Sequence, residues 1–317
     1  MNSDTAHNKI WIIFAILIII IPAGIWFAQE QPGEILNPHV ETASASSQTP
    51  LPTIKAKPQP FNSTALSQQI EKIITEQTPA GKEWVFGIAI EDPLTGQKYG
   101  KNQSEAFDAA STAKLPILTL LYEQIVQKKI SEDEKITINA ADIKDYGTGT
   151  IRYKKTPVTY TVRELAELMI KQSDNTAASV LAEKVGRTNL ADYVKKIGMN
   201  NTDIPENTTT PHDLNIMLAH IYTMKETDPA TAGTMIKIMT DSAFETRLPA
   251  LLPEDAIIAH KIGTGTAQIH DVGIGLLEKR PYLISVFTKK INDEKQAEKI
   301  IAMLSRAVYD EFKSLEQ

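Results

Sequence analysis

The sequence predicts an α/β domain of the α+β type, in which strands from both ends of the folded region share one sheet and an all-helical insert lies between them. Two observations favour this class. Helical and strand-like segments occur at both ends of the folded region, whereas its middle shows helical spacing only. Because strands and amphipathic helices must bury their apolar faces against each other, the two ends are expected to form one layered core.

The first elements are a helix and a strand pair. Leu66–Glu76 has apolar residues at helical spacing. Trp84–Tyr99 is typical of a hairpin, with Asp92, Pro93 and Gly96 supplying the turn.

The middle is predicted to be helical, and strands are predicted to return only near the C-terminus. The predicted helices are Ala113–Lys129, Val162–Lys171, Thr176–Val185, Leu190–Ile197, Pro211–Tyr222 and Pro229–Thr240. The C-terminal strands are Ile257–Ile262, Asp271–Leu277 and Tyr282–Thr288, followed by a helix over Asp293–Phe312.

The chain begins with a predicted membrane anchor. The apolar run Ile10–Ala28 is 19 residues long, which as a helix nearly crosses a ~30 Å hydrocarbon core. The alternative is a cleaved secretory signal, but Trp26 and Phe27 stand where small residues are needed. Residues 1–9 are then a short cytoplasmic tail, and Lys9 favours a catalytic region outside the cytoplasm, at the cell surface or in the periplasm.

After the anchor the composition changes. Residues 29–60 are rich in Pro, Ser, Thr and Ala and predict a disordered linker. Residues 61–317 predict one folded domain, which we expect to be monomeric. The net charge of -6 gives no basic excess for nucleic acid, and the absence of cysteine excludes disulfides, thiolate metal sites and a thiol nucleophile. No histidine pattern predicts a metal, and no cofactor is expected.

A serine and a lysine stand three residues apart at the start of a predicted helix. Ser111 and Lys114 would share one helix face, where the lysine can lie beside the hydroxyl as a cation or base and the helix N-terminus favours an alkoxide. The alternative is a serine N-cap beside a solvated lysine, because so short a motif occurs by chance.

Two further segments lie at element boundaries. In Ser173-Asp174-Asn175, the serine could relay a proton and the Asn175 amide could hold a substrate carbonyl, although the segment taken alone favours a plain helix cap. In Lys261–Gly265, the lysine would meet an anionic group and the glycines would admit a substrate along the strand, unless they form a bulge on an edge strand.

In this order, the three segments resemble the class A β-lactamases and the wider penicillin-recognising serine hydrolases, over about residues 61–317. The resemblance extends to Thr161–Leu168 before Ser173, to Thr208–Pro211, and to Leu248–Pro253 before Lys261. It implies an antiparallel sheet built from both termini, a helical domain, and a site at their junction.

The resemblance also implies roles for these residues. Ser111 would attack the carbonyl, Lys114 would handle its proton, and Ser173 would relay a proton to the leaving nitrogen. The backbone amides of Ser111 and Thr264 would form the oxyanion hole. Asn175 would hold the substrate amide, and Lys261 with Gly263, Thr264 and Gly265 would bind the substrate and its carboxylate.

Two departures from the family pattern stand out. Ile262 replaces a residue that carries a hydroxyl in class A enzymes. Between Gly198 and Thr208, the nine residues Met199–Asn207 replace a much longer loop that bears the deacylating Glu. Glu206 is a candidate replacement for that base, and the alternative is an ordinary surface turn.

The sequence therefore predicts an acyl-serine hydrolase that acts on β-lactams or on related small molecules derived from peptidoglycan, with slow deacylation. The alternatives are a D,D-peptidase or esterase, or a non-hydrolytic membrane-anchored protein that binds β-lactams or muropeptides.

Overall fold

The computed structural model describes residues 58–240 and 242–316, which form one compact unit. The predicted tail at 1–9, the predicted membrane segment at 10–28 and most of the predicted linker at 29–60 lie outside the described residues. Among the residues that are described, no helix is long and apolar enough to cross a membrane.

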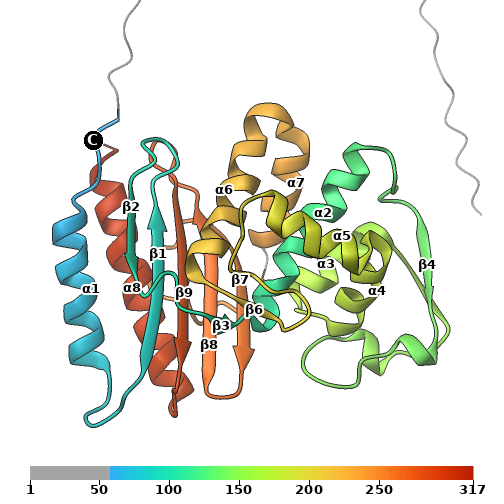
Figure 1. The fold of residues 1–317 in the computed structure, drawn as a ribbon, viewed down its shortest axis with the longest axis horizontal. Coiled ribbons are helices and arrows are strands. Elements are labelled where there is room, and N and C mark those ends of the chain that lie inside the picture. Colours follow the sequence, from blue (N-terminus) through green and yellow to red (C-terminus); the bar gives the residue numbers. More distant parts are fainter. Residues whose placement is uncertain (1–57, 241, 317) are drawn as a thin grey trace, which may run out of the picture. The chain divides into compact units, whose positions relative to one another are not determined.

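A five-stranded antiparallel sheet joins the two ends of the described chain (Figure 1). The strand order is β2-β1-β9-β8-β7, so that N-terminal β1 pairs directly with C-terminal β9. The strands are β1 (Val85–Glu91), β2 (Lys98–Lys101), β7 (Ile258–Gly265), β8 (Gln268–Gly275) and β9 (Tyr282–Lys289). The predicted fold class is confirmed.

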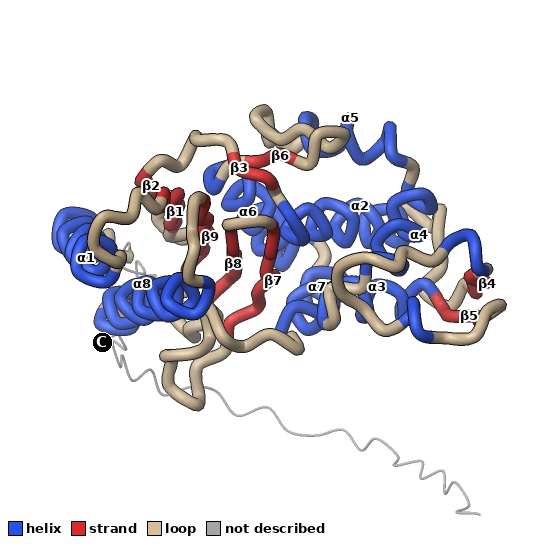
Figure 2. Tube along the Cα trace, turned by 90° about the horizontal axis from the view of Figure 1, so that it is seen from below, coloured by secondary structure: helices blue, strands red, loops and turns tan. Residues whose placement is uncertain are grey.

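Two helices cover one face of this sheet, α1 (Ser63–Gln77) and α8 (Glu294–Ser314), which lie side by side in Figure 2. Asn62 and Asp293 cap them by accepting a backbone N–H in the first turn. Ile70 of α1 is fully buried in one apolar cluster with residues of β1, β9 and α8. Burial of this cluster holds the terminal elements together.

The opposite face of the sheet packs against α6 (Pro211–Thr227). Gly87 makes this approach possible, because a Cβ there would lie 2.6 Å from the Phe107 ring and 2.8 Å from the Pro211 ring. The buried face of α6 continues into the helical part of the molecule.

The helical part is built around α2, whose apolar side chains are buried on nearly all sides. Its helices are α2 (Lys114–Val126), α3 (Val162–Lys171), α4 (Asn175–Val185), α5 (Arg187–Lys196), α6 and α7 (Pro229–Thr240). Thr161 and Glu164 form a capping box at the start of α3.

One prediction is wrong: strands do not return only near the C-terminus. β3 (Phe107–Asp108) pairs with β6 (Thr208–Thr209), and β4 (Lys135–Ile138) pairs with β5 (Val158–Thr161). Ladders of two to four residues are too short to show the alternation by which strands are identified in a sequence.

Candidate active site

Ser111 lies in a 3-10 turn, η1 (Ala110–Ala113), that leads directly into α2 at Lys114. The sequence predicted that both residues lie on one face of an α-helix, whereas Ser111 lies in the tighter 3-10 turn before it. This turn begins at Ala110, which adopts a φ of 45° and donates its N–H to Asp108 Oδ1 at 2.8 Å. The turn still places Ser111 and Lys114 on the wall of one cleft. Among the described residues, the Ser111 hydroxyl has no hydrogen-bond partner.

The Lys114 amine is buried, with 5% of the residue exposed. It donates to Ser173 O at 2.6 Å, to Ser173 Oγ at 3.1 Å and to Asn175 Oδ1 at 2.7 Å. Burial lowers the pKa of Lys114 to about 7, against the attraction of the Asp174 carboxylate. A large fraction of this amine is therefore neutral near pH 7, and a neutral amine can accept a proton.

The segment Ser173-Asp174-Asn175 serves both as a cap and as part of the site. Asp174 caps α4 by accepting the Ala177 N–H at 2.9 Å, as the simpler interpretation of the sequence expected. Ser173, with a φ of 53°, turns its hydroxyl and its carbonyl toward Lys114. A left-handed backbone at a serine is strained, and such strain is common at functional sites.

A glycine-rich loop that the sequence did not assign to the site supports this segment. Thr148 Oγ1 donates to Ser173 O at 2.7 Å, and Asn175 Nδ2 donates to Tyr146 O at 3.0 Å. Gly149 has a φ of 118°, and a Cβ there would lie 2.3 Å from Asp174 Oδ2. The repeated Gly-Thr pattern at 147–150 was the available signal, but nothing local in it points to a partner about 25 residues later.

Lys261 lies on β7 and is 1% exposed. Its amine donates to Ser173 Oγ at 3.1 Å and to Ile262 O at 3.0 Å. Burial, and then repulsion from Lys114, lowers the pKa of Lys261 well below its ordinary value. The sequence predicted that this lysine faces an anionic group of the substrate. In the structure it lies behind Ser173 rather than among the described residues that line the cleft.

Among the described residues of β7, Thr264 lines the cleft. Its Oγ1 accepts from Arg247 Nη2 at 2.7 Å, and Arg247 Nη1 donates to Gly263 O at 2.8 Å. Because the guanidinium occupies an acceptor site of this oxygen, the Thr264 O–H is free to donate into the cleft. Arg247 directly precedes the segment Leu248–Pro253, but no motif in the sequence points to it as a site residue.

Gly263 allows β7 to approach the serine turn closely. A Cβ at this position would lie 3.1 Å from Ala109 O and 3.2 Å from Ala110 Cβ. Gly265 pairs with Gln268 at the tip of the β7–β8 hairpin. The amides predicted as the oxyanion hole, those of Ser111 and Thr264, thus belong to two elements in contact.

Ser111, Lys114, Asn175 and Thr264 line a cleft of ≈ 630 Å³. No Asp or Glu of the described residues lines it. Glu206 is exposed, outside the cleft wall, and its backbone N–H donates to Asp203 Oδ1 at 3.1 Å. The structure therefore does not bring Glu206 to the nucleophile, because the short segment 199–207 turns it outward.

His260 on β7 and His270 on β8 are buried and do not line the cleft. His260 Nδ1 lies 2.9 Å from Asp271 Oδ1, and His270 Nε2 lies 2.9 Å from Asp108 O. In residues 58–240 and 242–316, no group of three or more His, Cys, Asp or Glu side chains is placed to hold a metal ion.

Comparison with known proteins places this site in a family. The model of the "Beta-lactamase enzyme family" matches residues 65–312. The extended-spectrum beta-lactamase PER-1 of Pseudomonas aeruginosa is 28% identical over 78% of this chain and 87% of its own length. The beta-lactamase SME-1 of Serratia marcescens is 27% identical over 77% of this chain and 88% of its own length.

Solved structures agree. PBP-A has a TM-score of 0.71 at 27% identity, covering 78% of this chain and 97% of that one. A variant of PBP-A, solved as an acyl-enzyme complex with penicillin G, has the same TM-score at 28% identity, covering 79% and 97%. An ancestral class A beta-lactamase has a TM-score of 0.68 at 26% identity, covering 77% and 99%. The chain belongs to the beta-lactamase enzyme family.

Proposed function

We propose that this chain is a serine hydrolase of the class A β-lactamase type, which opens β-lactam rings or related cell-wall amides through an acyl-enzyme on Ser111. One observation carries the proposal: Ser111 shares a cleft wall with Lys114, a buried amine whose pKa is lowered to about 7. The relatives named beta-lactamases support it.

The shared cleft wall supports the following route to acylation. A neutral Lys114 takes the proton of the Ser111 hydroxyl, and Oγ attacks the amide carbonyl. The amides of Ser111 and Thr264 stabilise the oxyanion. When the C–N bond breaks, Ser173 donates its proton to the leaving nitrogen and is reprotonated by one of the two lysine amines that contact its Oγ at 3.1 Å.

For deacylation, the described residues that line the cleft include no carboxylate base. Hydrolysis of the ester needs a base that activates a water, and no carboxylate of the described residues lines the cleft. The acyl-enzyme is therefore expected to persist, and turnover to be limited by its hydrolysis.

The full-length chain mixed with a fluorescent penicillin and with a chromogenic cephalosporin tests the proposal. We expect a covalent fluorescent adduct and slow colour development, both lost in Ser111→Ala. Fast colour change would contradict slow deacylation, and a long-lived adduct with no turnover would favour a penicillin-binding peptidase or sensor. Absence of both signals would refute acylation by Ser111.

We also propose that the segment at 10–28 anchors the chain in a membrane, with a monomeric catalytic domain outside the cytoplasm. The 19-residue apolar run supports this. Retention in membranes after alkaline extraction, digestion of the domain by external protease in intact cells or spheroplasts, and a monomeric mass by light scattering are the expected results. Release by alkali would contradict the anchor.

A further inference from the structure

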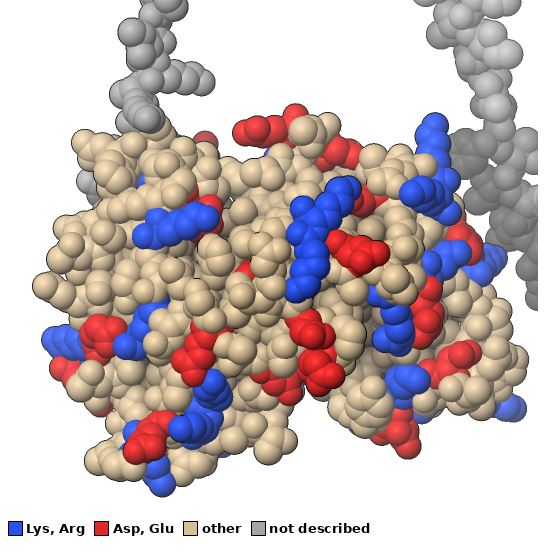
Figure 3. All heavy atoms as spheres, viewed as in Figure 1, with Lys and Arg blue, Asp and Glu red and all other residues tan. Residues whose placement is uncertain are grey.

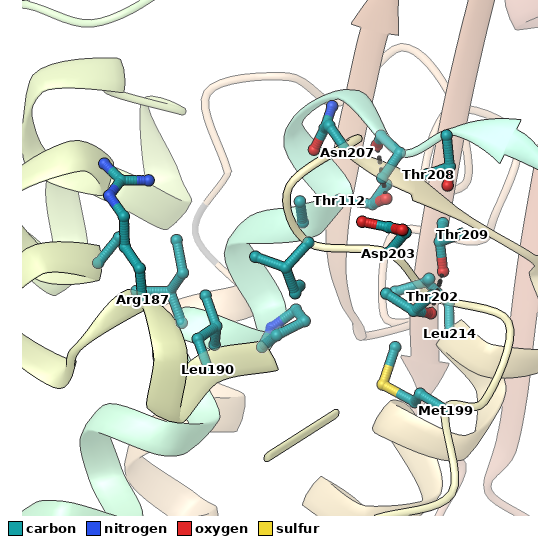
Figure 4. A pocket seen from close by; sticks show the side chains of 16 residues that line it. Thr112, Arg187, Leu190, Met199, Thr202, Asp203, Asn207, Thr208, Thr209 and Leu214 are labelled. Carbon is teal, nitrogen blue, oxygen red and sulfur yellow. Dashed lines mark hydrogen bonds between the residues drawn. The ribbon is translucent and has the colours of Figure 1, made fainter. Parts of the chain in front are cut away.

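A second pocket, shown in Figure 4, shares part of its wall with the cleft. It has a volume of ≈ 130 Å³ and lies between α2, α5 and the segment 199–209. Thr112 and Ala113, the two residues that follow Ser111, form part of its wall. The residues that line both the pocket and the cleft are Ala113, Ile117, Ala182, Arg187, Ile204 and Asn207.

The polar groups of the pocket wall are largely committed to one another. Thr202 Oγ1 lies 2.8 Å from Thr209 Oγ1 and donates to Asp213 Oδ2 at 2.9 Å. Thr112 Oγ1 donates to Ala109 O at 2.7 Å. These three hydroxyls therefore already have partners within the protein.

Another part of the wall is apolar. Leu190, Met199 and Leu214 line the pocket and are buried. An apolar cavity of comparable size, about 150 Å³, stays dry and binds benzene in another protein. The pocket therefore fits a phenyl ring or a branched aliphatic group.

We propose that this pocket receives the apolar side chain on the acyl portion of the molecule that acylates Ser111. The inference rests on the proposed function, and it names the substrate class as acyl donors with a neutral apolar group of about benzene size. Asp203 lines the pocket and is exposed, so its carboxylate disfavours negatively charged side chains. Arg187 also lines it, but pairs with Glu183.

Two probes with the same ring system test the proposal. Benzylpenicillin carries a phenylacetyl group, and 6-aminopenicillanic acid lacks it. The second-order acylation rate constant of the full-length chain, measured by intact mass spectrometry, should be about tenfold to a hundredfold higher for benzylpenicillin.

Leu190→Phe places a ring in the pocket from α5, and the ratio of the two rate constants should then fall toward one. Leu251→Phe, at a position that is 45% exposed, makes the same substitution elsewhere and should keep the ratio. A ratio that is near one in wild type, or unchanged in Leu190→Phe with its circular dichroism intact, would overturn the inference while acylation itself stands.

Met199 gives a readout that does not depend on Ser111. With ¹³C-methyl methionine, phenylacetamide should shift the Met199 signal saturably and leave Met169 unchanged, because Met169 lies on α3 and outside the pocket wall. If neither penicillin acylates the chain, the proposed function fails. If the Met199 signal then does not shift with phenylacetamide, the proposal that the pocket binds apolar groups fails as well. A saturable shift would support an apolar binding site that does not depend on acylation.

Discussion

Replacing Lys114 by methionine is expected to remove acylation and to change how stability depends on pH. The lysine is 5% exposed, and burial lowers its pKa from 10.5 to about 7. At ~1.36 kcal/mol per pH unit, this corresponds to about 5 kcal/mol of unfavourable free energy for the protonated amine in the folded state.

The sign follows from proton binding. Between about pH 7 and pH 10.5 the unfolded chain keeps the proton on Lys114 and the folded chain does not, so the free energy of unfolding rises with pH. The penalty is complete below about pH 7 and absent above pH 10.5. The stability of wild type relative to Lys114→Met should therefore rise by up to about 4 kcal/mol between pH 7 and pH 10.

Urea unfolding of both proteins, followed by circular dichroism at several pH values, measures this difference. Lys72→Met, at a side chain that is 70% exposed, controls for the loss of a lysine and should give a much smaller change. A difference that is flat, or that falls with pH, would show that Lys114 is not held neutral by burial and would refute the assignment of this amine as the base.

Three other predictions follow from the site. Acylation should accelerate as pH rises through about 7, where Lys114 loses its proton; a rate that falls over this range in stopped-flow measurements would contradict a neutral base. Ile204→Glu puts a carboxylate on the cleft wall and should shorten the acyl-enzyme half-life by about a hundredfold, measured by mass spectrometry, whereas an unchanged half-life would show that no water is activated there. Gly149→Ala should lower the free energy of unfolding in urea by about 2 kcal/mol or more, because the new Cβ would lie 2.3 Å from Asp174. Gly198 also has a positive φ, 97°, but nothing lies within 4 Å of a Cβ there, so Gly198→Ala should cost about 1 kcal/mol less. Equal losses in the two variants would contradict the steric argument.

On the face of the molecule shown in Figure 3, acidic and basic side chains are interspersed, and no large patch of one charge sign suggests a second binding site there. This agrees with the composition, which offers no basic excess. The functional features of the described chain are concentrated at the junction of η1, β7 and the start of α4.

Much of the fold and site could be predicted because the signals are local. Helix periodicity predicted α2 to α7, and the three short segments at element boundaries pointed to Ser111, Ser173 and Lys261. These segments combine residues that the backbone geometry requires with residues that carry chemistry. At Gly263, for example, the close approach of β7 to the serine turn needs a glycine.

The remainder depends on contacts between distant residues. No local pattern shows that Lys114 and Lys261 contact the same Ser173 hydroxyl, or that Arg247 supports Thr264. The direction of Glu206 depends on how a short segment is stretched between α5 and β6. Spacing alone cannot predict that direction, because a shift of one residue within a turn moves a side chain from the cleft side to the solvent side.

The pairing of the two ends of the described chain has a consequence for biosynthesis. β1 pairs with β2 and with β9. The Phe61 and Phe312 rings pack in a tilted arrangement at 5.2 Å between centroids, and the Asn62 N–H donates to Glu311. During synthesis β1 can pair with β2, but its other edge stays open until β9 has left the ribosome. The apolar face that α1 and α8 cover is closed only when the last helix is complete, so removal of α8 should leave this face of the sheet without that cover.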